Sequence, residues 1–254
     1  MTESEWDACT EPRRMLHFLL GTDHPRIEDV EAFPACKASD RKLRLFACAC
    51  YDRVRHLLDS PLAQAAVEVA ERFAESKVTA EELQRADARL RGALDTLEGR
   101  WRASRGAERT ALRPTHAALA LAFQATRPEA PKAAYYASSN AYLDAASLRN
   151  PGVASYDRRF HASQSAEERA QANLLRCING PLPFRPVRLD AAWLSGTVVL
   201  ARATYEERGW DDMGILADAL EEAGCDSDDI LSHCRGEGPH ARGCWVLDAL
   251  LGRS

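Results

Sequence analysis

The chain has 254 residues, of which 46% are hydrophobic and 28% are charged. This length can bury a substantial core in one large domain or two smaller ones, and the composition is typical of globular proteins. The net charge of −5 gives no general attraction to nucleic acid. The charge is uneven, however, at −8 for residues 190–254 and +3 for residues 1–189, so the N-terminal part is the better candidate for a polyanion surface.

Membrane insertion and export are not expected from the sequence. No stretch approaches the roughly 20 apolar residues that are needed to cross a bilayer. The N-terminal MTESEWDACTEPRR is acidic and lacks the apolar segment of a secretory signal. Eight cysteines are also too few for a disulfide scaffold in a chain of this length. We therefore expect a cytoplasmic protein with reduced thiols.

Helix-start signals and helical periodicity dominate the first part of the chain. Thr10, as the N-cap residue before Pro12, predicts the start of the first helix. Thr79 and Glu82 form a capping box, TAEE, that predicts the start of a long helix rich in Ala, Leu and Arg. The helices predicted in this part cover residues 10–20, 39–58, 61–73, 79–104, 115–125 and 131–148.

A polar, irregular segment after residue 149 is the best candidate for a boundary. Pro151 and its neighbours break the helical pattern. We interpret residues 150–164 as a linker between an N-terminal helical region, residues 1–149, and a C-terminal helical region, residues 165–254.

Helical signals resume at a second capping box, which joins Ser165 to Glu168 and predicts a helix to about Cys177. A proline-rich connector follows, and later helices are predicted at residues 197–207, 211–223, 227–234 and 244–251. No stretch alternates as a strand over five or more residues. The sequence therefore predicts an all-α fold, a multi-helix bundle-like array that forms one compact unit or two packed helical subdomains.

Basic residues recur along the predicted helix 39–58. They are Arg41, Lys42, Arg44, Arg53 and Arg55. Most lie on the side opposite the apolar stripe, so the simplest interpretation is a solvated basic face. Contact with a polyanion is the functional alternative.

The C-terminal tail concentrates residues that bind metals. Cys225, Cys234, His240 and Cys244 follow the spacing C-x8-C-x5-H-x3-C. Three thiolates and one imidazole form a standard structural zinc set, so these four residues are the candidate metal ligands. The spacing is close to that of CCCH-type RNA-binding zinc fingers, with the last two ligand types exchanged.

Two alternatives to this metal site stay open. In the first, the same cysteines only pack between short helices, because buried thiols behave as small hydrophobic groups. In the second, a nucleophilic cysteine is formed by Cys234 or Cys244 with His233 or His240 and Asp248. No reaction motif surrounds these cysteines, and residues 228–234 and 244–251 are predicted to be amphipathic helices rather than the irregular loops of a zinc finger. Packing is therefore the interpretation that we favour over both the metal site and the nucleophile.

Both ends of the chain carry motifs that form a familiar combination. They are SDRKLRLFACAC near the N-terminus, and PFRPV and HCRGEGPHARGCWVLDALLG near the C-terminus. Together they resemble a multi-copy family of uncharacterised proteins from planctomycete bacteria. The resemblance is weak over about residues 60–165, and it implies recurring ends with a variable middle. It implies no catalytic residues.

These observations favour a non-enzymatic protein-interaction or regulatory module whose partner is another protein. The sequence contains no nucleotide-binding, zinc-protease or serine-hydrolase motif. No cofactor is expected on this interpretation. The alternative is a zinc-stabilised, nucleic-acid-associated regulatory protein that uses the C-terminal Cys/His cluster.

Overall fold

The computed structural model describes residues 1–24 and 27–253, and within them the fold is all-α, as predicted. None of the helices in this part of the chain has both the length and the apolarity needed to cross a membrane. The α-helices are α1 (Glu3–Ala8), α2 (Pro12–Leu20), α3 (Asp40–Val54), α4 (Pro61–Ala74), α5 (Ala80–Ala103), α6 (Gly106–Thr126), α7 (Ala130–Arg149), α8 (Arg158–Asn179), α9 (Thr197–Glu207), α10 (Met213–Glu222), α11 (Asp228–Arg235) and α12 (Trp245–Leu250). Short 3₁₀ turns are η1 (Ile27–Asp29), η2 (Arg55–Leu57), η3 (Ala191–Leu194) and η4 (Trp210–Asp212).

Local capping explains where several helices begin. The predicted capping box of α5 is confirmed, with the Thr79 hydroxyl accepting from the Glu82 amide and the Glu82 carboxylate accepting from the Thr79 amide. A second box between Thr2 and Glu5 starts α1, which the sequence interpretation did not include. Such boxes satisfy amide groups that have no partner inside the helix.

Two helices begin earlier than predicted. α6 starts nine residues before the expected position and carries Pro114 in its interior. α8 is capped by Asp157, whose carboxylate accepts from the Arg159 amide at 2.8 Å, so Ser165 lies inside the helix rather than at its start. Residues 158–164 of the expected linker are therefore helical, because Asp157 supplies the cap that the Ser165 box was expected to provide.

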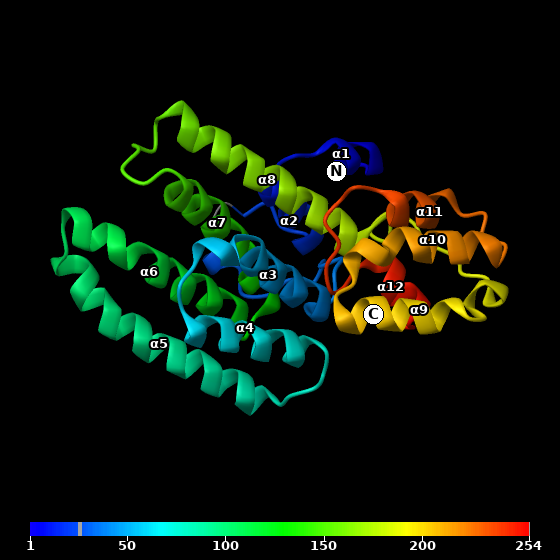
Figure 1. The fold of residues 1–254 in the computed structure, drawn as a ribbon, viewed down its shortest axis with the longest axis horizontal. Helices are drawn as coiled ribbons and strands as arrows, with labels where there is room; N and C mark the ends of the chain where they lie inside the picture. The colour runs from blue at the N-terminus through cyan, green and yellow to red at the C-terminus, as the bar shows by residue number, and fades with distance from the viewer. Residues whose placement is uncertain (25–26, 254) are drawn as a thin grey trace.

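Helix α3 lies at the centre of the larger part of the molecule and packs against α4, α6, α7 and α8 (Figure 1). The hairpin of α5 and α6 covers one side, and α2 packs on α7 and α8. Alanines on the facing sides of α6 and α7 are fully buried, which lets these helices approach closely. This first hydrophobic cluster extends from Trp6 to Ile178 and also includes Ala241.

A second hydrophobic cluster is formed by α9 to α12, on the right of Figure 1. It includes Tyr205, Leu216, Ile230 and Trp245, together with Cys177 from the end of α8. Helix α8 thus contributes to both clusters, and its last turn is the place where they meet. The division of the chain into two regions stays a prediction.

One carboxylate in the larger part of the molecule is poorly solvated. Burial raises the pKa of Asp144 in α7 to about 6, and the nearby Arg113 opposes this shift only in part. An unfolded aspartate titrates near 3.9, so the folded protein binds the extra proton between about pH 4 and pH 6. The neutral form of the Asp144 carboxyl therefore contributes to the free energy of unfolding at low pH. That contribution is lost as the pH rises through about 6.

We therefore expect Asp144→Asn to stabilise the protein at pH 7.5 by about 1–3 kcal/mol, with the gain shrinking towards zero near pH 4. Urea unfolding at pH 4.5, 6 and 7.5 measures this difference. Asp95→Asn, at an exposed position of α5, makes the same change in charge and is the control. A difference between the two variants that does not depend on pH would contradict the assignment.

Candidate metal centre

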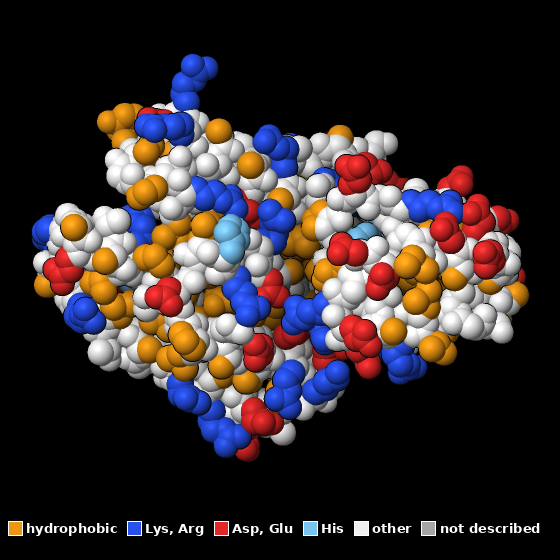
Figure 2. Space-filling model, in the orientation of Figure 1, with side chains coloured by type: hydrophobic (Ala, Val, Ile, Leu, Met, Phe, Trp, Pro, Cys, Tyr) orange, Lys and Arg blue, Asp and Glu red, His pale blue; other side chains and the backbone are white. Residues whose placement is uncertain are grey.

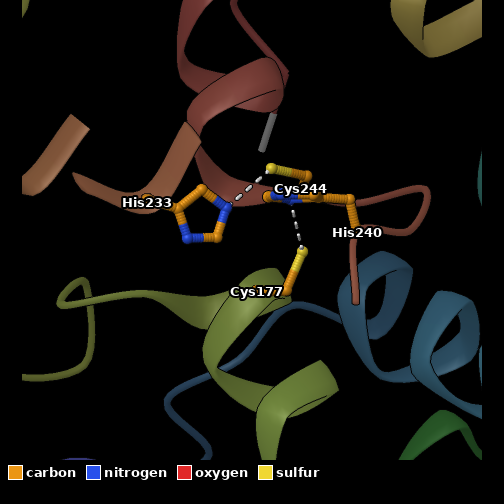
Figure 3. A group of neighbouring side chains, drawn as sticks. All are labelled: Cys177, His233, His240 and Cys244. Carbon is orange, nitrogen blue, oxygen red and sulfur yellow. Dashed lines mark hydrogen bonds between the residues drawn. The ribbon is translucent and has the colours of Figure 1, made fainter. Parts of the chain in front are cut away.

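Four side chains from separate segments converge where the two hydrophobic clusters meet. Cys177 projects from the end of α8, His233 from the last turn of α11, His240 from the following loop, and Cys244 from the residue before α12 (Figure 3). One ligand atom from each residue lies within 4.8 Å of the ligand atoms of the other three. Both cysteines are buried and both histidines are half-buried.

The distances are close to those of a tetrahedral metal site. His233 Nε2 lies 3.2 Å from Cys244 Sγ, and Cys177 Sγ lies 3.9 Å from His240 Nδ1. Zinc bonds of about 2.0 Å to nitrogen and 2.3 Å to sulfur place pairs of ligand atoms roughly 3.3–3.8 Å apart. The four side chains therefore match a zinc ion after only small movements.

A tight turn brings Cys244 into this group. Gly243 has φ +84°, a left-handed conformation that favours glycine. A Cβ at this position would also lie 3.0 Å from Leu45 Cδ1 of α3. The Gly243 amide donates to the Tyr205 hydroxyl at 3.3 Å, which fixes the turn against α9.

The two thiols shift each other's pKa in opposite directions. The hydrogen bond with Cys244, together with burial, raises the pKa of Cys177 well above its usual value. For Cys244, burial also acts to raise the pKa, but the hydrogen bond with Cys177 and the interactions with His233 outweigh it and hold the pKa well below its usual value. Because the thiolate is the form that binds metals, this arrangement prepares Cys244 as a ligand.

A buried lysine lies behind the two thiols. Lys42 Nζ donates to the Ile178 carbonyl at 2.5 Å and lies 3.4 Å from a carboxylate oxygen of Asp248. Burial lowers the pKa of Lys42, and Asp248 opposes that shift. The positive charge of Lys42 also acts to lower the pKa of Cys177. Lys42 thus stabilises negative charge on sulfur from the side of α3.

Of the four predicted ligands, the structure brings together His240 and Cys244. The other two members of the group, Cys177 and His233, were not predicted. Cys225 and Cys234 are buried in the second hydrophobic cluster and do not belong to the converging group. On α11, neighbouring residues point about 100° apart, so His233 and Cys234 cannot face the same point. His233 is the one that faces Cys244. Cys177 gave no signal in the sequence, because a proline-rich connector separates it from the tail.

The basic residues of α3 require a correction. Arg41, Lys42 and Arg44 do not form a solvated face, because α3 is surrounded by other helices. Arg44 is only 3% exposed, and its guanidinium donates to three carbonyls at the end of α6 and just after it. Arg53 pairs with the buried Glu167 at 2.7 Å, which leaves Arg55 as the exposed member of the predicted set.

The pair of His233 and Cys244 also has the geometry of a nucleophile and its base. Cys244, however, is fully buried, so a substrate has no direct access to its sulfur. Asp248 pairs with Arg41 and Lys42 rather than orienting a histidine. A second thiol and a second imidazole complete a set of four donors, which is typical of a metal centre.

The four residues form a Cys₂His₂ group that could hold a metal ion between α8 and the C-terminal segments, but this group does not identify a family. Comparisons of the chain with protein-family models, with curated proteins and with solved structures found no match. The resemblance to the planctomycete family therefore stays a prediction.

Proposed function

We propose that this chain is a zinc-stabilised helical protein with a non-enzymatic role. Cys177, His233, His240 and Cys244 would hold a single Zn²⁺ that fixes α8 to the C-terminal helices. The observation that carries the proposal is the convergence of two thiols and two imidazoles within 4.8 Å of one another.

The donor set supports a structural rather than a catalytic zinc. Catalytic zinc sites use three protein ligands and keep one position for water or substrate, whereas four protein ligands complete the tetrahedron. Two sulfur and two nitrogen donors also favour zinc over magnesium or calcium, which prefer oxygen. A filled coordination sphere agrees with a role in holding the fold together.

The biological role proposed with this site is that of a protein-interaction or regulatory module. An association with nucleic acid through α3 has less support, because Arg41, Lys42 and Arg44 are engaged inside the molecule. The alternative predicted from the sequence was a zinc-stabilised, nucleic-acid-associated regulatory protein. The present proposal retains the zinc of that alternative but not its association with nucleic acid.

Metal analysis of the purified full chain tests the proposal. We expect about one zinc per chain by plasma mass spectrometry, and Cys177→Ser and Cys244→Ser should each lose most of it because each removes one of four donors. Cys225→Ser is the matched control, because Cys225 is equally buried but lies outside the converging group.

Circular dichroism would verify that each variant is helical before its metal content is compared. His240→Asn, at a half-buried position, provides a milder loss of one donor. Purified wild-type protein that is folded and takes up no zinc when the metal is added would overturn the proposal.

A further inference from the structure

A cavity of about 390 Å³ opens at the junction of the two hydrophobic clusters. Its walls come from α3 and η2, from Glu71 of α4 and Leu174 of α8, and from the end of α9, Trp210 of η4 and the loop of residues 239–242. Lys, Arg, Asp and Glu side chains meet in the middle of this face, between α3 and α4 on one side and the C-terminal helices on the other (Figure 2). Ligand sites commonly occupy such junctions and have volumes in this range.

The lining carries more positive than negative charge. Four arginines, Arg53, Arg55, Arg208 and Arg242, face two carboxylates, Asp52 and Glu71. The lining residues by themselves therefore carry two more arginines than carboxylates. Glu167, which lies outside the cavity and pairs with Arg53, offsets one of these two positive charges.

The two carboxylates are shared rather than available to a ligand. Glu71 pairs with Arg208 at 2.5 Å and with Arg242 at 3.5 Å, and Asp52 pairs with Arg208 at 3.2 Å. Burial raises the pKa of Glu71, and the two arginines oppose that shift. Arg55 is exposed at the rim and forms no salt bridge among the residues that the structure describes.

Arg208 reaches the cavity from the end of α9. It ends α9 in a left-handed conformation with φ +57°, which is uncommon for a residue with a side chain. Its guanidinium crosses to α3 and α4, where it meets Asp52 and Glu71. These two ion pairs orient the Arg208 guanidinium in the wall, so it requires little further ordering when a ligand binds.

Apart from His240, the rest of the lining is apolar. Leu45 and Ala49 come from α3 and Leu174 comes from α8, whereas Trp210 lies in η4 and Pro239 lies in the loop of residues 239–242. Trp210 supplies the aromatic ring of the cavity. Arginines next to an aromatic and aliphatic wall provide separate places for an anionic group and for a ring.

We propose that this cavity binds a small organic anion, with its phosphate or carboxylate near Arg55 and the neighbouring arginines and its flat apolar part against Trp210. This site is separate from the metal centre in its contacts, and only His240 belongs to both. The excess of arginine over carboxylate selects for the negative charge, and the apolar wall selects for the ring.

Calorimetric titration of the full chain with three matched probes tests the proposal. They are 2-naphthyl phosphate, 2-naphthoate and the neutral 2-naphthalenemethanol, which share one ring system and differ in charge. We expect at least one of the two anions to bind with a Kd below about 1 mM and the neutral probe to bind at least about tenfold more weakly. The better anion identifies whether the cavity takes a phosphate or a carboxylate.

Variants place the binding in the cavity. Arg55→Gln and Trp210→Leu should each weaken the better anion by about fivefold or more, which corresponds to about 1 kcal/mol. Arg188→Gln, at an exposed position outside the cavity, is the matched control and should leave the Kd unchanged. The proposal would be overturned if neither anion binds or if the neutral probe binds equally well. It would also be overturned if Arg55→Gln and Trp210→Leu leave the binding intact.

Discussion

Removal of zinc from the proposed centre is expected to lower the midpoint of thermal unfolding by about 6–20 °C. In zinc-finger peptides, binding of structural zinc supplies about 10–16 kcal/mol, nearly all of which drives folding. The helices here also have two hydrophobic clusters of their own, so we expect a smaller loss of about 3–5 kcal/mol. For a chain of this size, each kcal/mol corresponds to about 2–4 °C.

The measurement is thermal unfolding by circular dichroism, with and without a strong chelator. Returning an equimolar amount of zinc should restore the midpoint. Cys225→Ser should respond to the chelator as the wild type does, whereas Cys244→Ser should show almost no response. A wild-type midpoint that is unchanged by the chelator, in protein shown to have lost its zinc, would contradict a structural role for the metal.

Asp248→Asn is expected to destabilise the protein by about 3–5 kcal/mol, because it removes the carboxylate beside the buried Lys42 ammonium and leaves Arg41 paired with Glu75 alone. The Asp248 side chain is 2% exposed and accepts two hydrogen bonds from Arg41, at 2.7 and 2.9 Å. It also lies 3.4 Å from Lys42 Nζ. The pair joins α12 of one hydrophobic cluster to α3 of the other.

Urea unfolding at neutral pH measures the loss for Asp248→Asn. Asp218→Asn in α10 makes the same chemical change at an exposed ion pair with Arg235 and should cost less than about 1 kcal/mol. A double-mutant cycle with Arg41→Gln should show strong non-additivity, since the two residues form one interaction. Equal losses for the two aspartates would show that the buried pair contributes no more than a surface pair.

Much of the helical architecture could be predicted from the sequence because its signals are local. The Thr79 capping box depends on residues three apart, and the helix ending before Gly224 depends on a glycine that adopts φ +90°. The apolar residues of α3 recur at helical spacing and are indeed buried. Such features depend on a few neighbouring residues and not on the rest of the chain.

The candidate site was only half predictable, because its other half depends on tertiary packing. His240 and Cys244 lie in one loop, where their spacing is visible. The choice of His233 over Cys234 depends on how α11 is rotated against α12, and Cys177 depends on where α8 ends. Arg44 was misplaced for the same reason, since only the fold brings the end of α6 to its guanidinium.

The wide separation of the four proposed metal ligands along the chain predicts an order of events during synthesis on the ribosome. Cys177 is made roughly 70 residues before Cys244, which is about 4–14 s earlier at 5–20 residues per second. During this interval the helices of the first hydrophobic cluster can assemble, while the other three residues of the group, His233, His240 and Cys244, have not yet been made. In a cell, zinc would therefore bind after the first cluster has formed, and it would join α8 to the last helices to be synthesised.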